Sequence, residues 1–349
     1  MPDVMDRQII RALQCSARAP FARIAEAVGA SEQTVARRYQ ALVRSGVVRV
    51  HGRVTPASYG QVEWVARIAC RPDRVGALAE ALVRRPEVSF ARLASGGSEI
   101  ICLLRSSAGD SGDTVLLKEL PRTSAVLNLH IDMILHGFGT GLSAEWNGYG
   151  GHLTTEQQAL LTAGAAPPSG PYREITDEDR PLLAALAEDG RATHARLAAE
   201  TGWSKGRVLR RLAALEESGA LAYDVDLLPE LLGHHLHATL WLRVPPRRLE
   251  AVGEEIARHD QIAFAGAISG PDNIMAVVIC RDTDDLYRFL TRQIASIPDI
   301  GGYEVSIRVR GLKQAGSLIT GGRLTPAPGP YVRPQGTGRG ERPRSPKGT

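Results

Sequence analysis

Two stretches of the chain place cationic and amide side chains on one face of a predicted helix. Residues 204–219 read SKGRVLRRLAALEESG, and residues 31–46 read SEQTVARRYQALVRSG. At 100° per residue, Val208, Leu212 and Leu215 form an apolar stripe that is expected to face a core. The opposite side and flank of each helix carry groups that can hydrogen-bond to base edges or phosphates in a DNA major groove. The predicted DNA-contacting residues are Gln33, Thr34, Arg37, Arg38, Lys205, Arg207, Arg210 and Arg211.

A basic outer face is also typical of an ordinary solvated helix, so composition alone does not decide between the two interpretations. The element before each stretch is a short helix joined to it by a tight Gly-x-Ser turn, the spacing of a helix-turn-helix motif. The arrangement occurs twice, and the basic residues lie in the N-terminal half, where recognition helices contact DNA. These features favour DNA recognition.

The helices belong to a larger internal duplication. An offset of 173 residues aligns residues 6–13 (DRQIIRAL) with residues 179–186 (DRPLLAAL) and continues without a gap through both helical stretches. An offset of 174 then aligns Phe90 with Phe264. We infer that the chain holds two copies of one two-part unit.

The first part of each unit is predicted to be three helices and a strand. In the first copy, residues 6–14 and 21–29 have helical apolar spacing, and Ser31 can cap a third helix that ends at Gly46. Alternating segments, VVRVHGRV and ALAYDVDL, follow the third helices. This pattern predicts a winged helix-turn-helix domain.

The second part of each unit reads strand, helix, strand, strand, helix, strand, the βαββαβ order of a ferredoxin-like fold. The segments of the first copy are 63–69, 72–85, 88–94, 99–105, 113–120 and a strand within 124–135; those of the second are 237–244, 246–259, 262–268, 273–280, 283–296 and 300–309. The predicted fold class is therefore α+β, with the two domains repeated in tandem. The predicted boundaries are 1–56 and 177–229 for the helix-turn-helix domains, 60–138 and 234–315 for the ferredoxin-like domains, 139–176 for a linker with one helical turn, and 316–349 for a disordered basic tail.

Residues 179–221, DRPLLAALAEDGRATHARLAAETGWSKGRVLRRLAALEESGAL, resemble the helix-turn-helix of the Lrp/AsnC (feast/famine) transcriptional regulators. The ferredoxin-like part that follows resembles the effector-binding and oligomerisation domain of the same family. The resemblance implies double-stranded DNA as a partner, an amino-acid effector, and homo-oligomers formed through the ferredoxin-like domains. Because two units are joined covalently, one chain resembles a built-in dimer.

The resemblance also implies an effector site at the loop between the second and third strands, where the family carries a Gly-x-x-Asp pattern. This chain has SGGSE in one copy and SGPDN in the other, so the acid is a glutamate or is displaced by one position. A plain β-hairpin turn explains both sequences equally well. The candidate ligand-binding residues are Gly96, Ser98, Glu99, Gly270, Asp272 and Asn273.

The two helix-turn-helix copies carry different charge. Residues 6–55 contain nine Arg and Lys against three Asp and Glu, whereas residues 179–228 contain seven against eight. Because phosphate neutralisation dominates DNA affinity, the first copy is expected to supply more non-specific binding. The basic tail is either a flexible phosphate binder or a solubilising segment.

Composition places limits on other functions. The four cysteines are widely separated and form no CxxC pair, so we expect reduced thiols in a cytoplasmic protein without a structural metal or cofactor. The cluster of His234, His235 and His237 lacks a partner set of metal ligands, and GFGTG (137–141) lacks the context of a phosphate loop. No segment reads as a membrane span.

The competing function is an enzyme. Siroheme decarboxylases are similar in fold to this family, occur as paired units and use His and Arg side chains to bind a tetrapyrrole. Only His130, His136 and the 234–237 cluster offer such groups here. A third alternative, an effector sensor that has lost DNA binding, is disfavoured by Arg37 and Arg210. We therefore predict a DNA-binding regulator and not an enzyme.

Overall fold

The computed structural model describes residues 2–55, 61–107, 120–139, 146, 148, 152–163 and 175–327. The first helical unit contains α1 (Val4–Cys15), α2 (Phe21–Val28) and α3 (Glu32–Arg44). Helix α2 ends at Gly29, whose φ of +68° favours glycine, and the Ser31 side chain caps α3 by accepting from the Thr34 amide.

The second helical unit repeats these local signals. It contains η6 (Asp177–Asp179), α6 (Arg180–Glu188), α7 (His194–Thr201) and α8 (Lys205–Glu217). Gly202 ends α7 with a φ of +72°, and Ser204 caps α8 through the Arg207 amide. The two predicted helix-turn-helix units are confirmed.

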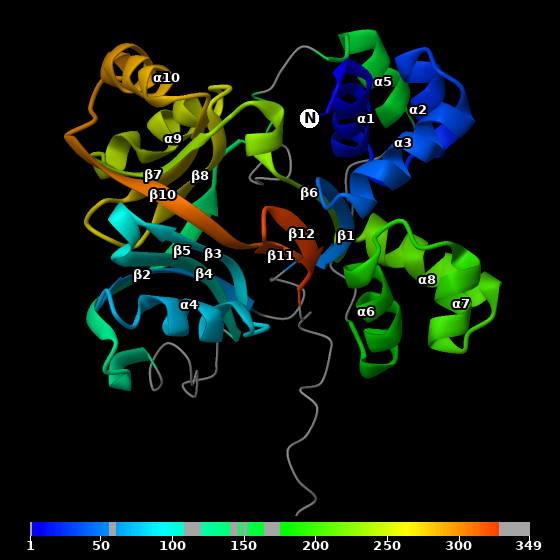
Figure 1. The fold of residues 1–349 in the computed structure, drawn as a ribbon, viewed down its shortest axis with the longest axis horizontal. Helices are drawn as coiled ribbons and strands as arrows, with labels where there is room; N and C mark the ends of the chain where they lie inside the picture. The colour runs from blue at the N-terminus through cyan, green and yellow to red at the C-terminus, as the bar shows by residue number, and fades with distance from the viewer. Residues whose placement is uncertain are drawn as a thin grey trace, which may run out of the picture.

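The strands that follow the recognition helices pair with each other. Strand β1 (Val48–Val54) lies antiparallel to β6 (Leu221–Leu227), and His51 is the register partner of Asp224. Because these two residues are equivalent under the 173-residue offset, a local two-fold axis passes between them. We call this two-stranded sheet the ribbon; Figure 1 shows it between the two helical units.

Both ferredoxin-like units have the predicted strand order. The first contains β2 (Gln61–Cys70), α4 (Val75–Val83), β3 (Val88–Ala94), η2 (Ser95–Gly97), β4 (Glu99–Ser107), η4 (Leu120–Arg122) and β5 (Val126–Gly137). The second contains η7 (Pro229–Leu232), β7 (Leu236–Arg243), η8 (Pro246–Arg248), α9 (Leu249–Ala257), β8 (Ile262–Ile268), β9 (Ile274–Cys280), α10 (Thr283–Arg288), η9 (Phe289–Gln293), η10 (Ile294–Ser296) and β10 (Gly302–Gln314). The helix predicted for the first copy at 113–120 falls almost entirely outside the described residues.

The last strand of each ferredoxin-like unit continues into the other unit. Strand β5 pairs with β2 and then with β8, while β10 pairs with β7 and then with β3. Among the described residues, the strands therefore close into a ring in the order β10-β3-β4-β2-β5-β8-β9-β7 and back to β10. Trp241, Met275 and Ile101 are buried together between the two halves of this ring.

Two segments differ from the sequence-based prediction. Residues 316–327 were predicted to start a disordered tail, but β11 (Ser317–Thr320) and β12 (Arg323–Pro326) form a hairpin that pairs with the end of β10. The prediction was wrong here because this segment is fixed by distant contacts with the ribbon and not by its own apolar content. The linker contains α5 (Thr155–Thr162), a longer helix than predicted, which packs on α1 and α2 (Figure 1). Residues 328–349 of the predicted tail lie outside the described residues.

Candidate nucleic-acid interface and interior cavity

The third helix of each helical unit has the predicted two faces. Val35 and Leu42 of α3 are buried, as are Val208, Leu212 and Leu215 of α8. The outward residues Gln33, Arg37, Lys205, Arg207 and Arg210 are exposed, and Thr34 is partly exposed. The sequence pattern therefore located the solvent-facing surface of both helices.

Two of the predicted DNA-contacting arginines hold the third helix to the first. Arg38 Nη1 lies 2.7 Å from Asp3 Oδ2 and 2.8 Å from Asp6 Oδ1. At the equivalent place in the second unit, Arg211 Nε donates to Asp179 Oδ1 at 2.7 Å. Burial alone would raise the pKa of Asp179, but hydrogen bonds from Arg211 and the Thr176 backbone outweigh it and lower that pKa.

The other cationic side chains on the outer faces of α3 and α8 differ in whether they contact the rest of the protein. Arg207 forms an ion pair with Glu178 and stacks over the Trp203 ring at 4.1 Å. Within the described part of the chain, Arg37, Lys205 and Arg210 make no ion pair or hydrogen bond through their side chains. The charged groups of these three side chains can therefore bind a polyanion without breaking an internal contact.

Reciprocal arginines join the two helical units. Arg18 Nη1 donates to the Gly190 carbonyl, and the equivalent Arg191 donates to the carbonyls of Ala17 and Ala19 at 2.6 and 2.8 Å. Because each guanidinium binds the loop of the other unit, these contacts fix the orientation of one recognition helix against the other.

The ribbon pairs a basic strand with an acidic one. Strand β1 contributes Arg49, His51 and Arg53, and β6 contributes Asp224 and Asp226. Arg53 Nε lies 2.8 Å from Asp224 Oδ2, and His51 Nε2 lies 3.2 Å from Asp226 Oδ2. Burial opposes protonation of His51, yet the nearby aspartates raise its pKa above the ordinary value. Because the two copies are oppositely charged here, β1 favours β6 over another β1.

The C-terminal hairpin is fixed to this ribbon. The buried Ser317 hydroxyl donates to Asp226 Oδ2 at 2.6 Å and accepts from Arg49 Nη1 at 2.9 Å. The Leu324 amide donates to the Gly46 carbonyl, at the end of α3, at 2.8 Å. The hairpin therefore connects β10 with the first helical unit, a contact that sequence reasoning missed because no motif marks it.

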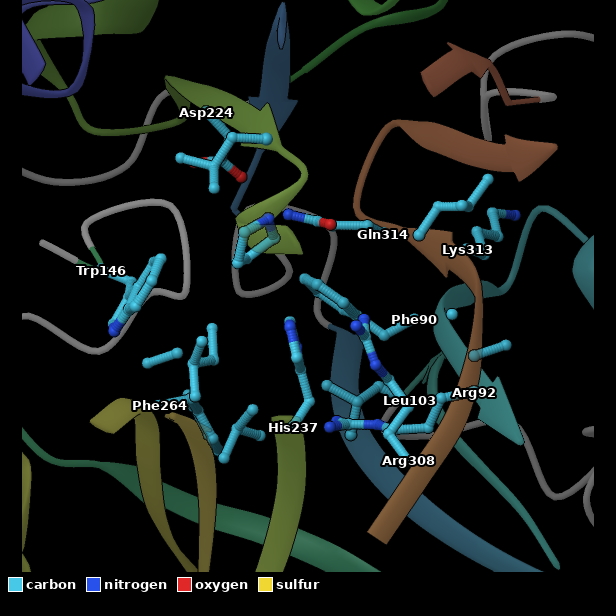
Figure 2. Close-up of a pocket in the computed structure, with 18 of the residues that line it drawn as sticks. Phe90, Arg92, Leu103, Trp146, Asp224, His237, Phe264, Arg308, Lys313 and Gln314 are labelled. Carbon is cyan, nitrogen blue, oxygen red and sulfur yellow. The ribbon is translucent and has the colours of Figure 1, made fainter. Parts of the chain in front are cut away.

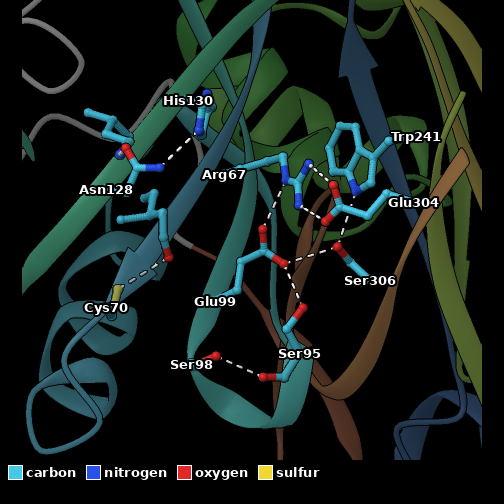
Figure 3. Close-up of polar contacts among 12 residues, drawn as sticks. Arg67, Cys70, Ser95, Ser98, Glu99, Asn128, His130, Trp241, Glu304 and Ser306 are labelled. Atoms are coloured by element: carbon cyan, nitrogen blue, oxygen red, sulfur yellow. Dashed lines mark hydrogen bonds and ion pairs between the residues drawn. The ribbon is translucent and has the colours of Figure 1, made fainter. Parts of the chain in front are cut away.

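The first candidate effector loop is part of a network between the two ferredoxin-like units. Glu99 accepts hydrogen bonds from Arg67 Nε at 2.9 Å, Ser95 Oγ at 2.8 Å and Ser306 Oγ at 3.0 Å, as Figure 3 shows. Arg67 also pairs with Glu304 of β10. The Ser98 hydroxyl donates to the Ser95 carbonyl, and Gly96 has a φ of +70°. The carboxylate expected to meet an effector is thus engaged within the protein.

The second loop is equally engaged. Asp272 forms an ion pair with Arg243, and Asn273 exchanges two hydrogen bonds with the backbone of Val244. A Cβ at Gly270 would lie 2.6 Å from an Asp132 oxygen of β5, so a larger residue there would displace the Asp132 side chain. Each loop therefore packs against the crossing strand of the other unit.

A cavity lies where the two ferredoxin-like units meet the ribbon, and sequence reasoning did not predict it. Figure 2 shows Phe264 and Trp146 on one side and Phe90 and Arg308 on the other, with the His237 side chain between them. The cavity volume is about 140 Å³. Phe90 and Phe264 are equivalent under the 174-residue offset. The sequence repeat could therefore have predicted that both rings lie near the axis that relates the two ferredoxin-like units.

The histidine cluster is distributed over different environments. His237 is buried with its Nε2 3.2 Å from the His234 carbonyl oxygen, and burial holds its pKa well below the ordinary value. The His234 ring packs edge-on against Trp146. Among the described residues, no group of three or more His, Cys, Asp and Glu side chains is arranged to hold a metal ion.

Comparison with known families supports the two-part organisation. A model of the AsnC-type helix-turn-helix domain matches residues 3–43 and 175–216, and a model of the Lrp/AsnC ligand binding domain matches residues 237–318. No helix in the described ranges combines the length and apolar content needed to cross a membrane.

Individual relatives match about one repeat of the chain. The HTH-type transcriptional regulator LrpA of Pyrococcus horikoshii is 29% identical over 127 residues, which cover 36% of this chain and 90% of that protein. The HTH-type transcriptional regulator AldR of Mycolicibacterium smegmatis is 25% identical over 150 residues, covering 42% and 88%. Among solved structures, the siroheme decarboxylase NirDL covers 90% of this chain and 93% of its own with a TM-score of 0.59 and 14% identity. This last likeness shows the fold alone.

Proposed function

The chain belongs to the Lrp/AsnC family as a tandem form, and we propose that it is a sequence-specific DNA-binding transcriptional regulator. The observation that carries this proposal is the pair of recognition helices held in one fixed arrangement. Arg18, Arg191 and the ribbon join the two helical units, and the outer faces of α3 and α8 present free cations. One chain would then contact two adjacent segments of duplex DNA, as a dimer does.

The proposed contacts divide the predicted residues into two groups. Gln33, Thr34 and Arg37 would contact DNA from α3, and Lys205, Arg207 and Arg210 from α8. We assign Arg38 and Arg211 a positioning role, because their guanidinium groups are bound to Asp6 of α1 and to Asp179 at the start of α6. Their substitution would affect DNA binding through the angle of the helix.

The two helical units would contribute differently to DNA binding. The first unit has the larger excess of basic residues and would dominate attraction to phosphates. The second unit carries two unpaired cations, Lys205 and Arg210, and its binding would depend more on the base sequence.

We also propose that the protein responds to an amino-acid effector and assembles into homo-oligomers. We retain Gly96, Ser98, Glu99, Gly270, Asp272 and Asn273 as the candidate amino-acid site; ligand entry there would have to replace the internal contacts of Glu99 and Asp272. Homo-oligomers would form through the outer surface of the crossing strands, where large apolar side chains are exposed. These are Leu127, Leu135, Tyr303, Ile307 and Val309. We further propose a cytoplasmic location and a binding rather than an enzymatic role.

The decisive experiment measures affinity for the DNA upstream of the protein's own gene at about 50 and 200 mM salt. Arg37→Ala and Arg210→Ala should each weaken binding and reduce the salt slope by about one unit, because each removes about one phosphate contact. Arg84→Ala is the matched control, since Arg84 caps the C-terminal end of α4 and its side chain is 74% exposed. Figure 1 shows α4 on the other side of the molecule from α3 and α8. Unchanged affinity and slope in both test variants would refute the regulator proposal. A tetrapyrrole absorbance band on the purified protein would overturn the non-enzymatic role.

A further inference from the structure

The interior cavity has a charge balance that points to a ligand. Two of its arginines already have a carboxylate partner, since Arg105 forms an ion pair with Glu63 at 3.0 Å and Arg53 with Asp224 at 2.8 Å. A third, Arg308, pairs with Glu230. The acidic side chains at the cavity are therefore already engaged.

Arg92 of β3 remains without a counter-charge. In the part of the chain that the structure describes, its side chain makes no hydrogen bond or ion pair. Burial and the neighbouring Arg308 lower the pKa of Arg92 to about 10, so the guanidinium is still charged at neutral pH. A partly buried cation without a partner is costly unless an anion binds it.

Of the other lining residues, His237, Lys313 and Gln314 are polar, with Lys313 donating to the Arg85 carbonyl, and most of the remainder are apolar. Phe90, Leu103, Phe264 and Val277 face the cavity, and Figure 2 shows the Phe90 and Phe264 side chains on opposite sides of the His237 side chain. An apolar wall with a few convergent polar groups is typical of a small-molecule site.

We propose that this cavity binds a small monocarboxylate with an apolar body of about one aromatic ring. Arg92 would take the carboxylate, and the phenylalanine rings would enclose the body. The size follows from the volume of about 140 Å³, since an apolar cavity of about 150 Å³ accommodates benzene. The excess positive charge disfavours a ligand with its own ammonium group, which distinguishes this site from the candidate amino-acid site at the loops.

The duplication predicts one such ligand per chain. Under the 174-residue offset, the counterpart of Arg92 is Gly266 of β8. A Cβ at Gly266 would lie 2.8 Å from the Phe264 ring and 3.0 Å from the His136 carbonyl oxygen, so β8 has no room for an equivalent side chain. The two copies therefore create a single asymmetric site and not a pair.

The test is calorimetric titration of the full chain with phenylacetate, its uncharged counterpart phenylacetamide, and L-phenylalanine. Phenylacetate should bind at one equivalent per chain and more tightly than the other two probes. Arg92→Met should weaken phenylacetate about ten- to a hundredfold, the expected loss for a hydrogen bond to a charged group, and leave phenylacetamide unchanged. Arg84→Met, at the exposed α4 site, should change neither.

Several results would overturn the proposal. They are the absence of saturable phenylacetate binding by the wild type, equal binding of acid and amide, two equivalents per chain, or equal affinity in Arg92→Met and Arg84→Met. Arg92→Lys, which keeps the positive charge, should recover part of the affinity; equal loss in Lys and Met variants that melt like the wild type also contradicts it. Because the assay contains no DNA, its outcome is independent of whether the chain is a regulator.

Discussion

Replacing Asp179 with asparagine should loosen the recognition helix α8 from the start of α6, the first helix of its unit. Asp179 is only 1% exposed and accepts from Arg211, whose side chain is 24% exposed, and from the Thr176 amide. Removing one partner of a fully buried ion pair costs about 3–5 kcal/mol. Because Arg211 is partly solvated and asparagine keeps one acceptor oxygen, we expect about 2–3 kcal/mol here.

The duplication supplies a matched control. Asp6 occupies the equivalent place in the first unit, but Arg38 also binds Asp3 there and the Asp6 side chain is 17% exposed. Asp6→Asn should therefore cost only about 0–1 kcal/mol, since Asp3 continues to hold the arginine. The two variants make the same chemical change in two environments.

Hydrogen exchange followed by mass spectrometry measures the effect locally. In Asp179→Asn, amides of α8 should exchange about 30- to 150-fold faster at neutral pH, which corresponds to 2–3 kcal/mol at about 1.36 kcal/mol per tenfold. Amides of α3 should change less than about tenfold in Asp6→Asn. Equal effects in the two variants, or wild-type exchange of α8 in Asp179→Asn, would show that the buried pair does not hold the helix. Because the pKa of Asp179 is lowered in the folded state, its contribution is present above the ordinary value of 3.8 and is lost as pH falls through the lowered pKa.

Two further predictions concern the ribbon. Because the pKa of His51 is raised in the folded state, its charged form stabilises the fold fully below pH about 6.5, and this contribution is lost as pH rises through the raised pKa. The melting-temperature difference between wild type and His51→Gln should therefore shrink between pH 6 and 9. A difference that stays constant over this range would contradict a stabilising charge on His51. Ser317→Ala should lower the free energy of unfolding by about 1–3 kcal/mol in urea, because Asp226 and Arg49 each lose a buried partner. The exposed Ser296→Ala is its control and should stay within about 0.5 kcal/mol; equal values for the two serine variants would count against a fixed hairpin.

Local features of the fold were predictable because their causes lie within a few residues. The left-handed Gly29 and Gly202 and the caps Ser31 and Ser204 bound the recognition helices where the sequence placed them. Helical periodicity depends on neighbours three and four positions apart, so it also predicted the buried and exposed faces of α3 and α8.

The roles of the arginines on those faces required the tertiary structure. Arg37 and Arg38 are adjacent and chemically identical, yet Arg37 is exposed while Arg38 reaches Asp3, which lies 35 residues earlier. Sequence spacing gives no distance between segments that meet only after the helices pack. The same limit explains why the fixed hairpin at Ser317 was predicted as a tail.

The amino-acid sequence by itself determined the duplication, the helix-turn-helix units and the βαββαβ order, since each follows from repeats and short-range patterns. Only the tertiary structure decided how the two copies combine. The crossing of β5 and β10 into the opposite unit, the basic-to-acidic ribbon and the unpaired Arg92 at the cavity depend on contacts between residues that are more than a hundred positions apart or on the absence of such contacts. The physical reason is that two similar sequences occupy unequal environments once they pack together, and the inequality is a property of the packing.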